Sequence, residues 1–297
     1  STTYTKLQTN KRIFSFFKKS KKENNQKLRP RCTTYRDSFN KKKISKFKKY
    51  SQIRLFGMGG SSLGAQTIYH FLKHKIKKNF LFFDNLEVSK DNLKVNKKNL
   101  NLIVSKSGDT LETISTSNIL IKKNEKNIFI TENKKNYLTT LAKKLKSEII
   151  HHNNFIGGRY SVFSEVGMIP AELMGLNVNK FRQFNKLVNN KQFINSLISN
   201  VFNIHQLNKK KRFNSVILNY DNSSSNLFYW YQQLVAESLG KKGKGILPIV
   251  SNMPRDNHSL MQLYLDGPNN NFYTLFFVED KTSIKINNQI LLKSHGY

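Results

Sequence analysis

The residue types best suited to chemistry gather in one short stretch, Ser105-Lys106-Ser107-Gly108-Asp109-Thr110. An apolar run over residues 100–104 precedes it and predicts a buried strand, and a helical pattern follows it from Leu111 to about Ile121. The stretch therefore lies on a strand-to-helix turn, where unpaired backbone N–H groups and the positive end of the helix dipole attract an anion. Three hydroxyls, one ammonium and the compliant Gly108 favour phosphate as the bound group. The alternative is an ordinary helix cap, because Ser, Asp and Thr all cap helices well.

A second ligand-facing turn is predicted upstream, at Gly57-Met58-Gly59-Gly60-Ser61-Ser62-Leu63-Gly64. It follows a short predicted strand over residues 53–56 and precedes a helical stretch over residues 65–72. Dinucleotide-binding turns carry Gly at their first, third and sixth positions, whereas the sixth position here is Ser62. We therefore interpret the stretch as a glycine turn that lets a ligand approach the backbone, with Ser61 supplying a hydroxyl.

Strands and helices alternate along most of the chain. Further strands are predicted over residues 80–83, 127–131, 148–150, 213–220, 246–250 and 272–278. Helices are predicted over residues 137–144, 168–173, 226–239 and 256–265, with a long helix or helix pair over 181–207. This alternation predicts an α/β fold with a parallel sheet covered by helices on both faces. Ligands bind such sheets at the carboxyl ends of strands, so the two turns are expected to converge on one ligand.

Three further side chains could act on a bound anion. Arg159, in the loop Gly157-Gly158-Arg159-Tyr160-Ser161, is a rigid cation suited to an anion or a developing oxyanion, with a solvated surface arginine as the alternative. Gln233 and Glu237 lie four residues apart on a predicted helix and so share one face. Apolar neighbours predict a partly dry site for Glu237, which would raise its pKa and suit it to proton transfer; an exposed helix-end glutamate is the alternative. A lone histidine such as His258, at the start of a helix, is more often structural than catalytic.

Length and composition limit the class of protein. The chain has 297 residues, which suggests two domains, and its formal net charge is +33. Such a charge suggests a nucleic-acid or membrane partner, but most basic residues are lysines spread along the chain, among abundant Asn, Ile and Phe, as an AT-rich genome would favour. We therefore interpret the charge as background and expect no nucleic-acid partner. The single cysteine, Cys32, excludes an internal disulfide, and no apolar run approaches the ~20 residues that span a bilayer, so a soluble cytoplasmic protein without a membrane partner is expected.

Taken in order, five motifs resemble those of the glucose-6-phosphate isomerase family. They are the turns at 57–64 and 105–110, the arginine loop at 157–161, Glu237-Ser238-Leu239-Gly240-Lys241 and Asn257-His258-Ser259. The resemblance spans roughly residues 50–280. It implies two sugar isomerase (SIS) domains, each a three-layer α/β sandwich with a parallel sheet, over residues 51–175 and 176–297. A basic N-terminal arm or helical preface over residues 1–50 would precede them.

The resemblance also implies a reaction and its residues. The reaction is the reversible isomerisation of glucose 6-phosphate and fructose 6-phosphate through a cis-enediol, without cofactor or metal. The family is usually dimeric, with the histidine contributed by the partner chain, so a homodimer is expected. By this resemblance Glu237 is the base, Arg159 stabilises the enediol oxygens, and His258 helps to open the sugar ring. The sugar phosphate, mainly its phosphate group, would be held by Gly60, Ser61, Ser105, Lys106, Ser107, Thr110 and Gln233.

Two features depart from the family's pattern. Asp109 places a carboxylate inside the phosphate turn, where it either points outward as a cap or weakens phosphate binding. The family's catalytic lysine lies on a helix well beyond the histidine, whereas here the residues after His258 predict a strand and a polar tail from Ile284 to Tyr297. Lys293, in that tail, lies in no matching motif. We therefore expect a second domain that is truncated at the C-terminus and lacks this lysine.

Two other functions compete with an isomerase. A non-catalytic sugar-phosphate sensor would keep the phosphate turn, but it would not need Glu237, Arg159 and His258 together. A nucleic-acid-binding protein, suggested by the charge of +33, should bind DNA with steep salt dependence. An isomerase that also accepts mannose 6-phosphate is a variant of the isomerase hypothesis. Lys106 together with the arginine loop favours an enzyme specific for glucose 6-phosphate.

Overall fold

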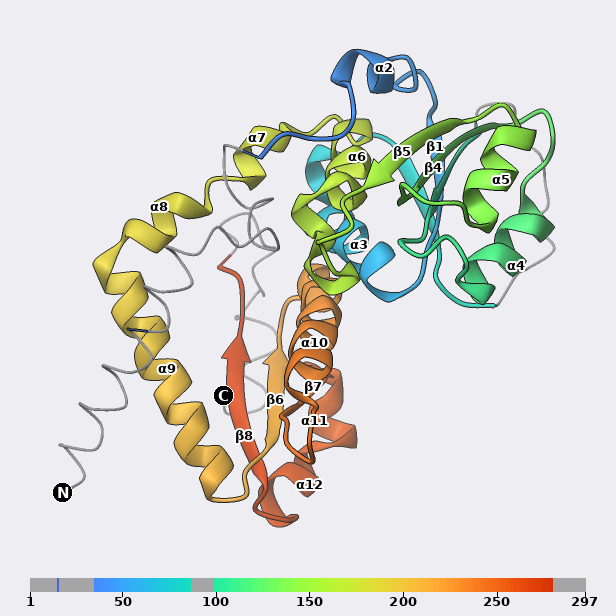
Figure 1. Cartoon of the computed structure of the whole chain (residues 1–297). Coiled ribbons are helices and arrows are strands. Elements are labelled where there is room, and N and C mark those ends of the chain that lie inside the picture. Colours follow the sequence, from blue (N-terminus) through green and yellow to red (C-terminus); the bar gives the residue numbers. More distant parts are fainter. Residues whose placement is uncertain (1–14, 16–34, 87–98, 280–297) are drawn as a thin grey trace, which may run out of the picture.

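Two parallel sheets organise the chain in this computed structural model, which describes residues 15, 35–86 and 99–279 (Figure 1). The first sheet has five strands in the order β2-β1-β3-β4-β5, and the second has three in the order β7-β6-β8. Every pair of neighbouring strands is parallel. The predicted α/β class with parallel sheets is therefore confirmed.

The elements of the first unit follow the predicted alternation closely. Its strands are β1 (Gln52–Phe56), β2 (Asn79–Phe83), β3 (Asn99–Val104), β4 (Lys126–Glu132) and β5 (Glu148–His152). Its helices are α3 (Leu63–Phe71), α4 (Leu111–Leu120), α5 (Tyr137–Lys144) and α6 (Glu165–Leu173). Short 3-10 segments lie between them: η2 (Gly59–Ser61), η3 (Lys73–Lys75) and η5 (Gly158–Phe163).

Helices cover both faces of the first sheet, and this produces three layers. Strand β3 is buried along its whole length, and its successive side chains point to opposite faces. Leu102 joins a cluster with α3 and α6, whereas Ile103 joins a second cluster that contains Leu120 of α4 and Leu138 of α5. Burial on both faces explains why apolar residues follow one another without alternation from Leu102 to Val104. The buried Asn101 is the polar exception, and its side chain accepts a hydrogen bond from Arg54.

The part of the N-terminal arm that the structure describes, residues 35–50 with helix α2 (Lys41–Ser45), packs onto the first unit. Ile44 and Phe47 are buried in the larger cluster. Arg182, 4% exposed, forms a two-pronged ion pair with Asp37, in which Nη1 lies 2.9 Å from Oδ2. The segment thus contributes Phe39, Ile44 and Phe47 to the first core, and Asp37 also ties it to Arg182 at the end of α7 (Val178–Phe181). The predicted basic stretches before residue 35 lie outside the described residues.

The second unit begins with helices α7 (Val178–Phe181), α8 (Phe184–Asn189) and α9 (Lys191–Lys209). Of the two alternatives predicted over residues 181–207, a long helix or a helix pair, the structure has the pair α8 and α9. Helix α9 begins where the Asn190 side chain accepts a hydrogen bond from the Phe193 N–H. The rest comprises β6 (Asn214–Asn219), η6 (Asn222–Ser224), α10 (Ser225–Leu239), β7 (Leu247–Asn252), α11 (Arg255–Ser259), α12 (Met261–Asp266) and β8 (Asn271–Phe276). The single helix predicted over 256–265 is wrong, since the chain breaks at Leu260 into α11 and α12. The predicted polar tail lies outside the described residues.

Helix α10 joins the two units, since it packs against β7 of its own sheet and against α3 of the first unit (Figure 1). Thr67 Oγ1 donates to the Asn226 carbonyl at 2.9 Å, and Trp230 Nε1 donates to the Arg159 carbonyl at 3.0 Å. The Trp230 ring also meets Phe163 edge-on, with 6.4 Å between centroids. The amino-terminal half of α10 is thereby bonded to α3 and to the backbone of the arginine loop.

Candidate active site

The turn at residues 105–110, which the sequence predicts to bind phosphate, contains hydroxyls that lie close to one another. Gly108 has φ +76°, a conformation that side chains rarely adopt, and its N–H donates to Ser105 Oγ at 3.1 Å. Ser105 Oγ lies 2.8 Å from Thr110 Oγ1, and the Asp109 N–H donates to Ser107 Oγ at 3.3 Å. Thr110 occupies the N-cap position of α4 but makes no side-chain cap hydrogen bond. The hydroxyls therefore organise the turn itself, and the ordinary-cap interpretation does not describe Thr110.

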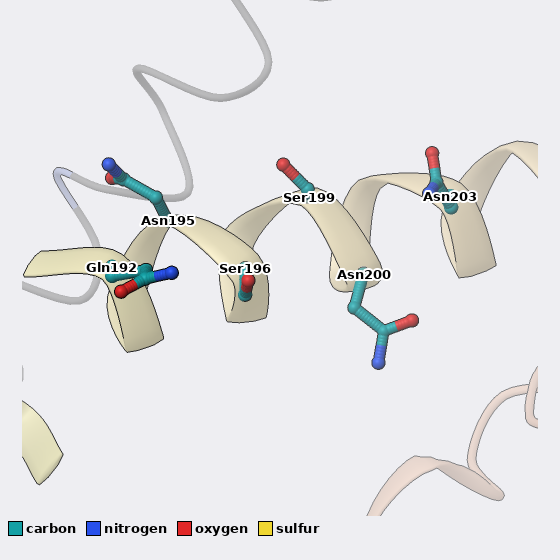
Figure 2. A pocket seen from close by; sticks show the side chains of 6 residues that line it. All are labelled: Gln192, Asn195, Ser196, Ser199, Asn200 and Asn203. Atoms are coloured by element: carbon teal, nitrogen blue, oxygen red, sulfur yellow. The ribbon is translucent and has the colours of Figure 1, made fainter.

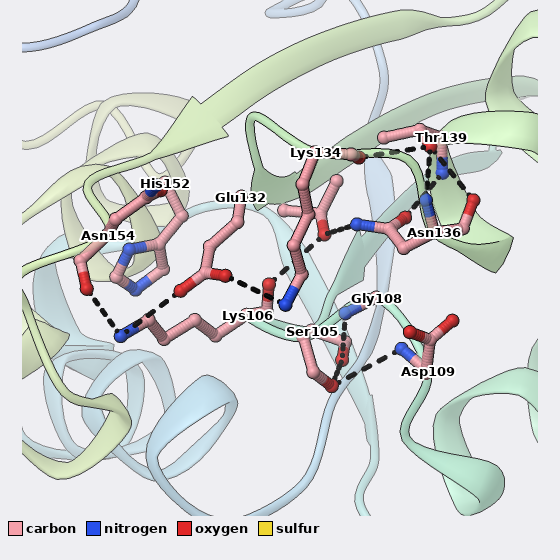
Figure 3. A network of polar contacts seen from close by, with 12 residues as sticks. Ser105, Lys106, Gly108, Asp109, Glu132, Lys134, Asn136, Thr139, His152 and Asn154 are labelled. Carbon is pink, nitrogen blue, oxygen red and sulfur yellow. Dashed lines mark hydrogen bonds and ion pairs between the residues drawn. The ribbon is translucent and has the colours of Figure 1, made fainter.

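Lys106 extends away from this turn toward the ends of the next two strands (Figure 3). Its ammonium donates to the Asn154 carbonyl at 2.8 Å and lies 3.2 Å from Glu132 Oε1, while Lys134 pairs with the other oxygen of Glu132 at 3.1 Å. Burial alone would raise the pKa of Glu132, but the two lysines outweigh it and lower that pKa. His152 lies close by, 2% exposed, and burial lowers its pKa. Lys106 would have to leave these partners in order to reach a phosphate in the turn.

Asp109 points outward as a cap, one of the two outcomes expected for it. Its Oδ1 accepts a hydrogen bond from the Tyr137 N–H, at the start of α5, at 2.9 Å. A carboxylate at a helix N-terminus is favourable, because it satisfies an unpaired N–H and meets the positive end of the dipole. The carboxylate is thus bonded to α5, and it does not join the hydroxyl cluster.

The glycine turn and the arginine loop touch each other directly. A Cβ added at Gly60 would lie 2.3 Å from the carbonyl carbon of Gly158 and 2.6 Å from the Arg159 nitrogen, so only glycine fits there. Ser161 Oγ donates to the Gly158 carbonyl at 2.6 Å and also lies 3.2 Å from the Gly60 carbonyl oxygen. Ser61, next along the turn, is half-buried. The two loops therefore form one surface at the carboxyl-terminal edge of the first sheet.

Arg159 and Glu237 form the charged centre of this surface. Arg159 Nη1 lies 2.7 Å from Glu237 Oε1, and Arg159 Nε donates to Ser238 Oγ at 2.9 Å. The Tyr160 hydroxyl lies 2.8 Å from the same Ser238 Oγ. Partial burial alone would lower the pKa of the Arg159 guanidinium, but Tyr160 and Glu237 outweigh it and raise that pKa. The Glu237 side chain is 52% exposed, so the predicted partly dry site is wrong and the exposed helix-end alternative holds.

Gln233 lies on the same face of α10 as Glu237, as the four-residue spacing predicts. Its Nε2 stands 2.8 Å from the position of a Cβ on Gly59, so its amide packs against the glycine turn. Gln233 Oε1 is buried and has no hydrogen-bond partner among the described residues. An unpaired buried acceptor can accept a hydrogen bond from a ligand hydroxyl.

His258 is exposed on α11, and no hydrogen bond between described residues joins it to the Arg159–Glu237 pair. Its helix is held by Asp256, which is 6% exposed and accepts from the Asn252 N–H at 2.7 Å and from Ser251 Oγ at 3.2 Å. Burial alone would raise the pKa of Asp256, but these hydrogen bonds and Arg255 outweigh it and lower that pKa.

The structure thus brings together Gly60, Arg159, Gln233 and Glu237, with the hydroxyls of Ser105, Ser107 and Thr110 at the end of the neighbouring strand β3. Lys106 and His258 stand apart from this group. Sequence reasoning missed Ser238, which orients Arg159, and Trp230, which holds the backbone of the arginine loop. Ser238 lies in the motif Glu237-Ser238-Leu239-Gly240-Lys241, so its position next to Glu237 could have indicated that it belongs to the site.

The arrangement suits proton transfer next to an anion. A carboxylate able to take up a proton lies beside a guanidinium that can stabilise developing negative charge. Among the described residues, no three His, Cys, Asp or Glu side chains gather so as to hold a metal ion. None of the helices in the described part of the chain combines the length and the hydrophobicity of a membrane span.

Comparisons with known proteins point to one family. A family model described as phosphoglucose isomerase matches residues 9–247. A glucose-6-phosphate isomerase of Methanocaldococcus jannaschii is 34% identical over 269 residues, which cover 83% of this chain and 65% of the relative. One of Campylobacter jejuni is 30% identical over 250 residues, covering 77% and 61% of the two chains. This chain therefore spans less than two thirds of the length of these relatives.

Two solved structures share the fold. A crystal structure of a hypothetical protein from Thermus thermophilus matches with a TM-score of 0.77 at 21% identity, covering 98% of this chain and 75% of that one. A crystal structure of a glucose-6-phosphate isomerase from Chlamydia trachomatis matches with a TM-score of 0.60, also at 21% identity, covering 77% and 51%.

Proposed function

Because this chain belongs to the phosphoglucose isomerase family, we propose that it takes part in the reversible isomerisation of glucose 6-phosphate and fructose 6-phosphate. The observation that carries the proposal is the 2.7 Å contact between Arg159 and Glu237, on the surface that also holds Gly60 and Gln233. The matched relatives are longer than this chain, so the activity of the whole protein belongs to this proposal.

Glu237 is the proposed proton carrier. In its carboxylate form it removes the proton from C2 of the open-chain aldose while a proton is delivered to O1, which gives a cis-enediol. Glu237 then returns its proton to C1 as the O2 proton leaves, which gives the ketose. The reaction moves protons without net oxidation, so it requires no redox cofactor. General-base catalysis of this kind contributes about 10²–10⁴-fold.

Arg159 would stabilise the negative charge that develops on the enediol oxygens. Its side chain is held in place by Ser238 at 2.9 Å and its backbone by Trp230 at 3.0 Å, so little reorganisation is needed when charge develops. When substrate binds, the Glu237 oxygen that now contacts Arg159 would exchange this contact for the C2 proton.

The phosphate group would bind at the turn over residues 105–110, distant from the reacting carbons, so that binding energy positions C1 and C2 next to Glu237. Ser105, Ser107 and Thr110 would turn their hydroxyls from one another to the phosphate. Gly60 and Ser61 would supply the neighbouring surface. Lys106 would contribute its charge only after exchanging Glu132 for the phosphate, and Gln233 Oε1 would accept from a sugar hydroxyl.

His258 is proposed to act across a homodimer, where it would assist ring opening in the site of a second copy. Its exposure on α11 and its lack of a hydrogen bond to the Arg159–Glu237 pair among the described residues support this assignment. We also propose that residues 51–175 and 176–297 belong to two sugar isomerase domains, and that the protein works in the cytoplasm without a nucleic-acid partner.

A coupled assay tests the proposal, in which glucose 6-phosphate formed from fructose 6-phosphate is oxidised and the reduced nicotinamide is measured. We expect Glu237→Gln to lower kcat by about 10²–10⁴-fold while fructose 6-phosphate still binds. Asp266→Asn, at the end of α12, is a matched control that should leave kcat unchanged. Full turnover in Glu237→Gln would rule out the assigned base. Binding without any turnover in the unaltered chain would favour the sugar-phosphate sensor.

A further inference from the structure

A pocket of about 630 Å³ lies at the amino-terminal edge of the first sheet. Its walls are the segments that lead into three parallel strands: residues 46–50 before β1, 123–127 at the start of β4, and 145–148 at the start of β5. The phosphate turn follows the carboxyl end of β3 and therefore lies at the opposite edge of this sheet. The pocket is thus separate from the candidate active site.

Positive charge dominates the pocket, which is lined by Lys46, Lys49, Lys123, Lys126 and Lys146. All five lysines are exposed. Two glutamates also line the pocket, but both have cationic partners already. Glu125 lies 2.6 Å from the buried Arg54, and Glu148 lies 3.1 Å from Lys46.

Four of these lysines, all except Lys46, form no ion pair with a carboxylate of the described residues. Like charges around one depression repel one another, and a low-dielectric wall strengthens the field inside it. Two aromatic side chains give the pocket an apolar, low-dielectric part of its lining: Phe47 is 7% exposed and Tyr50 is half-buried. The pocket therefore combines uncompensated positive charge with a partly apolar base.

A second depression shows the contrast. It measures about 640 Å³ and lies along α9, where it is lined only by neutral amide and hydroxyl side chains such as Gln192 and Ser199 (Figure 2). All of its lining residues belong to this one helix, and they carry no charge. Size alone therefore does not distinguish the lysine pocket, whereas its charge and its construction from three segments do.

We propose that the lysine pocket is a second anion site, which binds a small molecule carrying several phosphate groups. Its volume lies within the range of small-molecule sites, about 300–1,000 Å³. A single phosphate group offsets only part of the charge of four unpaired lysines, whereas a chain of phosphates contacts several of them at once. This site goes beyond the isomerase proposal and stands whether or not that proposal holds.

Inorganic tripolyphosphate is the ligand for the test, and calorimetric titration of the 297-residue chain at about 0.1 M salt is the measurement. The test variant is Lys123→Gln with Lys146→Gln, which removes two charges from different walls. The control is Lys209→Gln with Lys210→Gln, which removes the same charge from exposed positions at the end of α9. We expect the pocket variant to weaken binding about tenfold and the control to change it less than twofold.

Three further titrations complete the test. Saturating glucose 6-phosphate should leave the tripolyphosphate affinity unchanged, and inorganic phosphate should bind far more weakly. Equal weakening by both variants would overturn the proposal, because binding would then follow net charge. Competition by glucose 6-phosphate would assign tripolyphosphate to the active site instead. A single-stranded DNA oligonucleotide that binds more tightly than tripolyphosphate, and that the pocket variant alone weakens, would assign the surface to nucleic acid and would also refute the small-molecule site.

Discussion

Strand β3 is buried along its whole length in the first unit, whereas β8 of the second unit leaves Tyr273 44% and Leu275 60% exposed. The helix that carries Glu237, α10, has no fully buried residue. It is nevertheless held firmly, because Asn226 and Trp230 hydrogen-bond to Thr67 and Arg159 of the first unit. The first unit therefore supplies the rigid framework, and the second unit contributes the proposed base through a helix that takes its position from its neighbour.

The largest expected effect is on stability, and it follows from the difference in burial between β3 and β8. Leu102→Ala should lower the free energy of unfolding by about 2–5 kcal/mol, because it deletes a fully buried side chain from a core with helices packed on it. Leu275→Ala, at an exposed position of β8, should change it by less than about 0.5 kcal/mol. Urea unfolding followed by circular dichroism measures both. Equal losses would mean that the two sheets contribute equally to stability.

A smaller effect is expected where the units meet. Arg159→Lys keeps the charge but cannot contact Ser238 and Glu237 in the same two directions, so kcat should fall by about 10²-fold. Arg255→Lys is the matched control in the second unit, since the Arg255 side chain is 77% exposed. Its kcat should be unchanged. Steady-state kinetics on fructose 6-phosphate decides, and an unaffected Arg159→Lys variant would remove Arg159 from the mechanism.

Trp230→Phe tests the hydrogen bond that joins α10 to the arginine loop, and a smaller effect is expected. It removes the hydrogen bond to the Arg159 carbonyl and keeps a ring against Phe163, so the cost should be about 1 kcal/mol in stability or in the activation barrier. Tyr229→Phe, on the same helix and 39% exposed, is the control. If kcat and unfolding are both unchanged in Trp230→Phe, the position of α10 depends on other contacts.

The smallest expected effect is on the pH dependence of stability, which can be tested with one carboxylate in each unit. The pKa values of Asp256 in the second unit and Glu132 in the first are both lowered, so each carboxylate stabilises the fold above its unfolded pKa. That contribution is lost as the pH falls through the lowered folded-state pKa. Between pH 5 and pH 3, the urea midpoint should therefore fall less in Asp256→Asn than in the unaltered chain. Glu132→Gln makes the same comparison for the first unit. If either variant lost stability with falling pH as steeply as the unaltered chain, the lowered pKa of that carboxylate would be contradicted.

Local patterns allowed much of the fold to be predicted. The apolar run at 100–104, the helix at 137–144 and the shared face of Gln233 and Glu237 all follow from contacts within a few residues along the chain. The break at Leu260 was missed because the periodicity of residues 256–265 does not mark it.

Contacts distant in sequence could not be predicted in this way. Lys106 reaches Asn154, 48 residues later, and Asp109 reaches Tyr137, 28 residues later. Both contacts depend on how neighbouring strands are aligned, and the sequence of one segment does not determine that alignment. The exposure of Glu237 was misjudged for the same reason, since apolar neighbours on α10 such as Trp230 pack against the first unit rather than around the carboxylate.

The anchor at Trp230 has a practical consequence. Trp230 is the only tryptophan of the chain, and its indole N–H bonds across the boundary between the two units. Any separation of the two units would expose the Trp230 ring to water and shift its fluorescence emission to longer wavelength. Intrinsic fluorescence therefore reports on this boundary without an added label, and a shift on mixing with a sugar phosphate would show that the surroundings of Trp230 have changed.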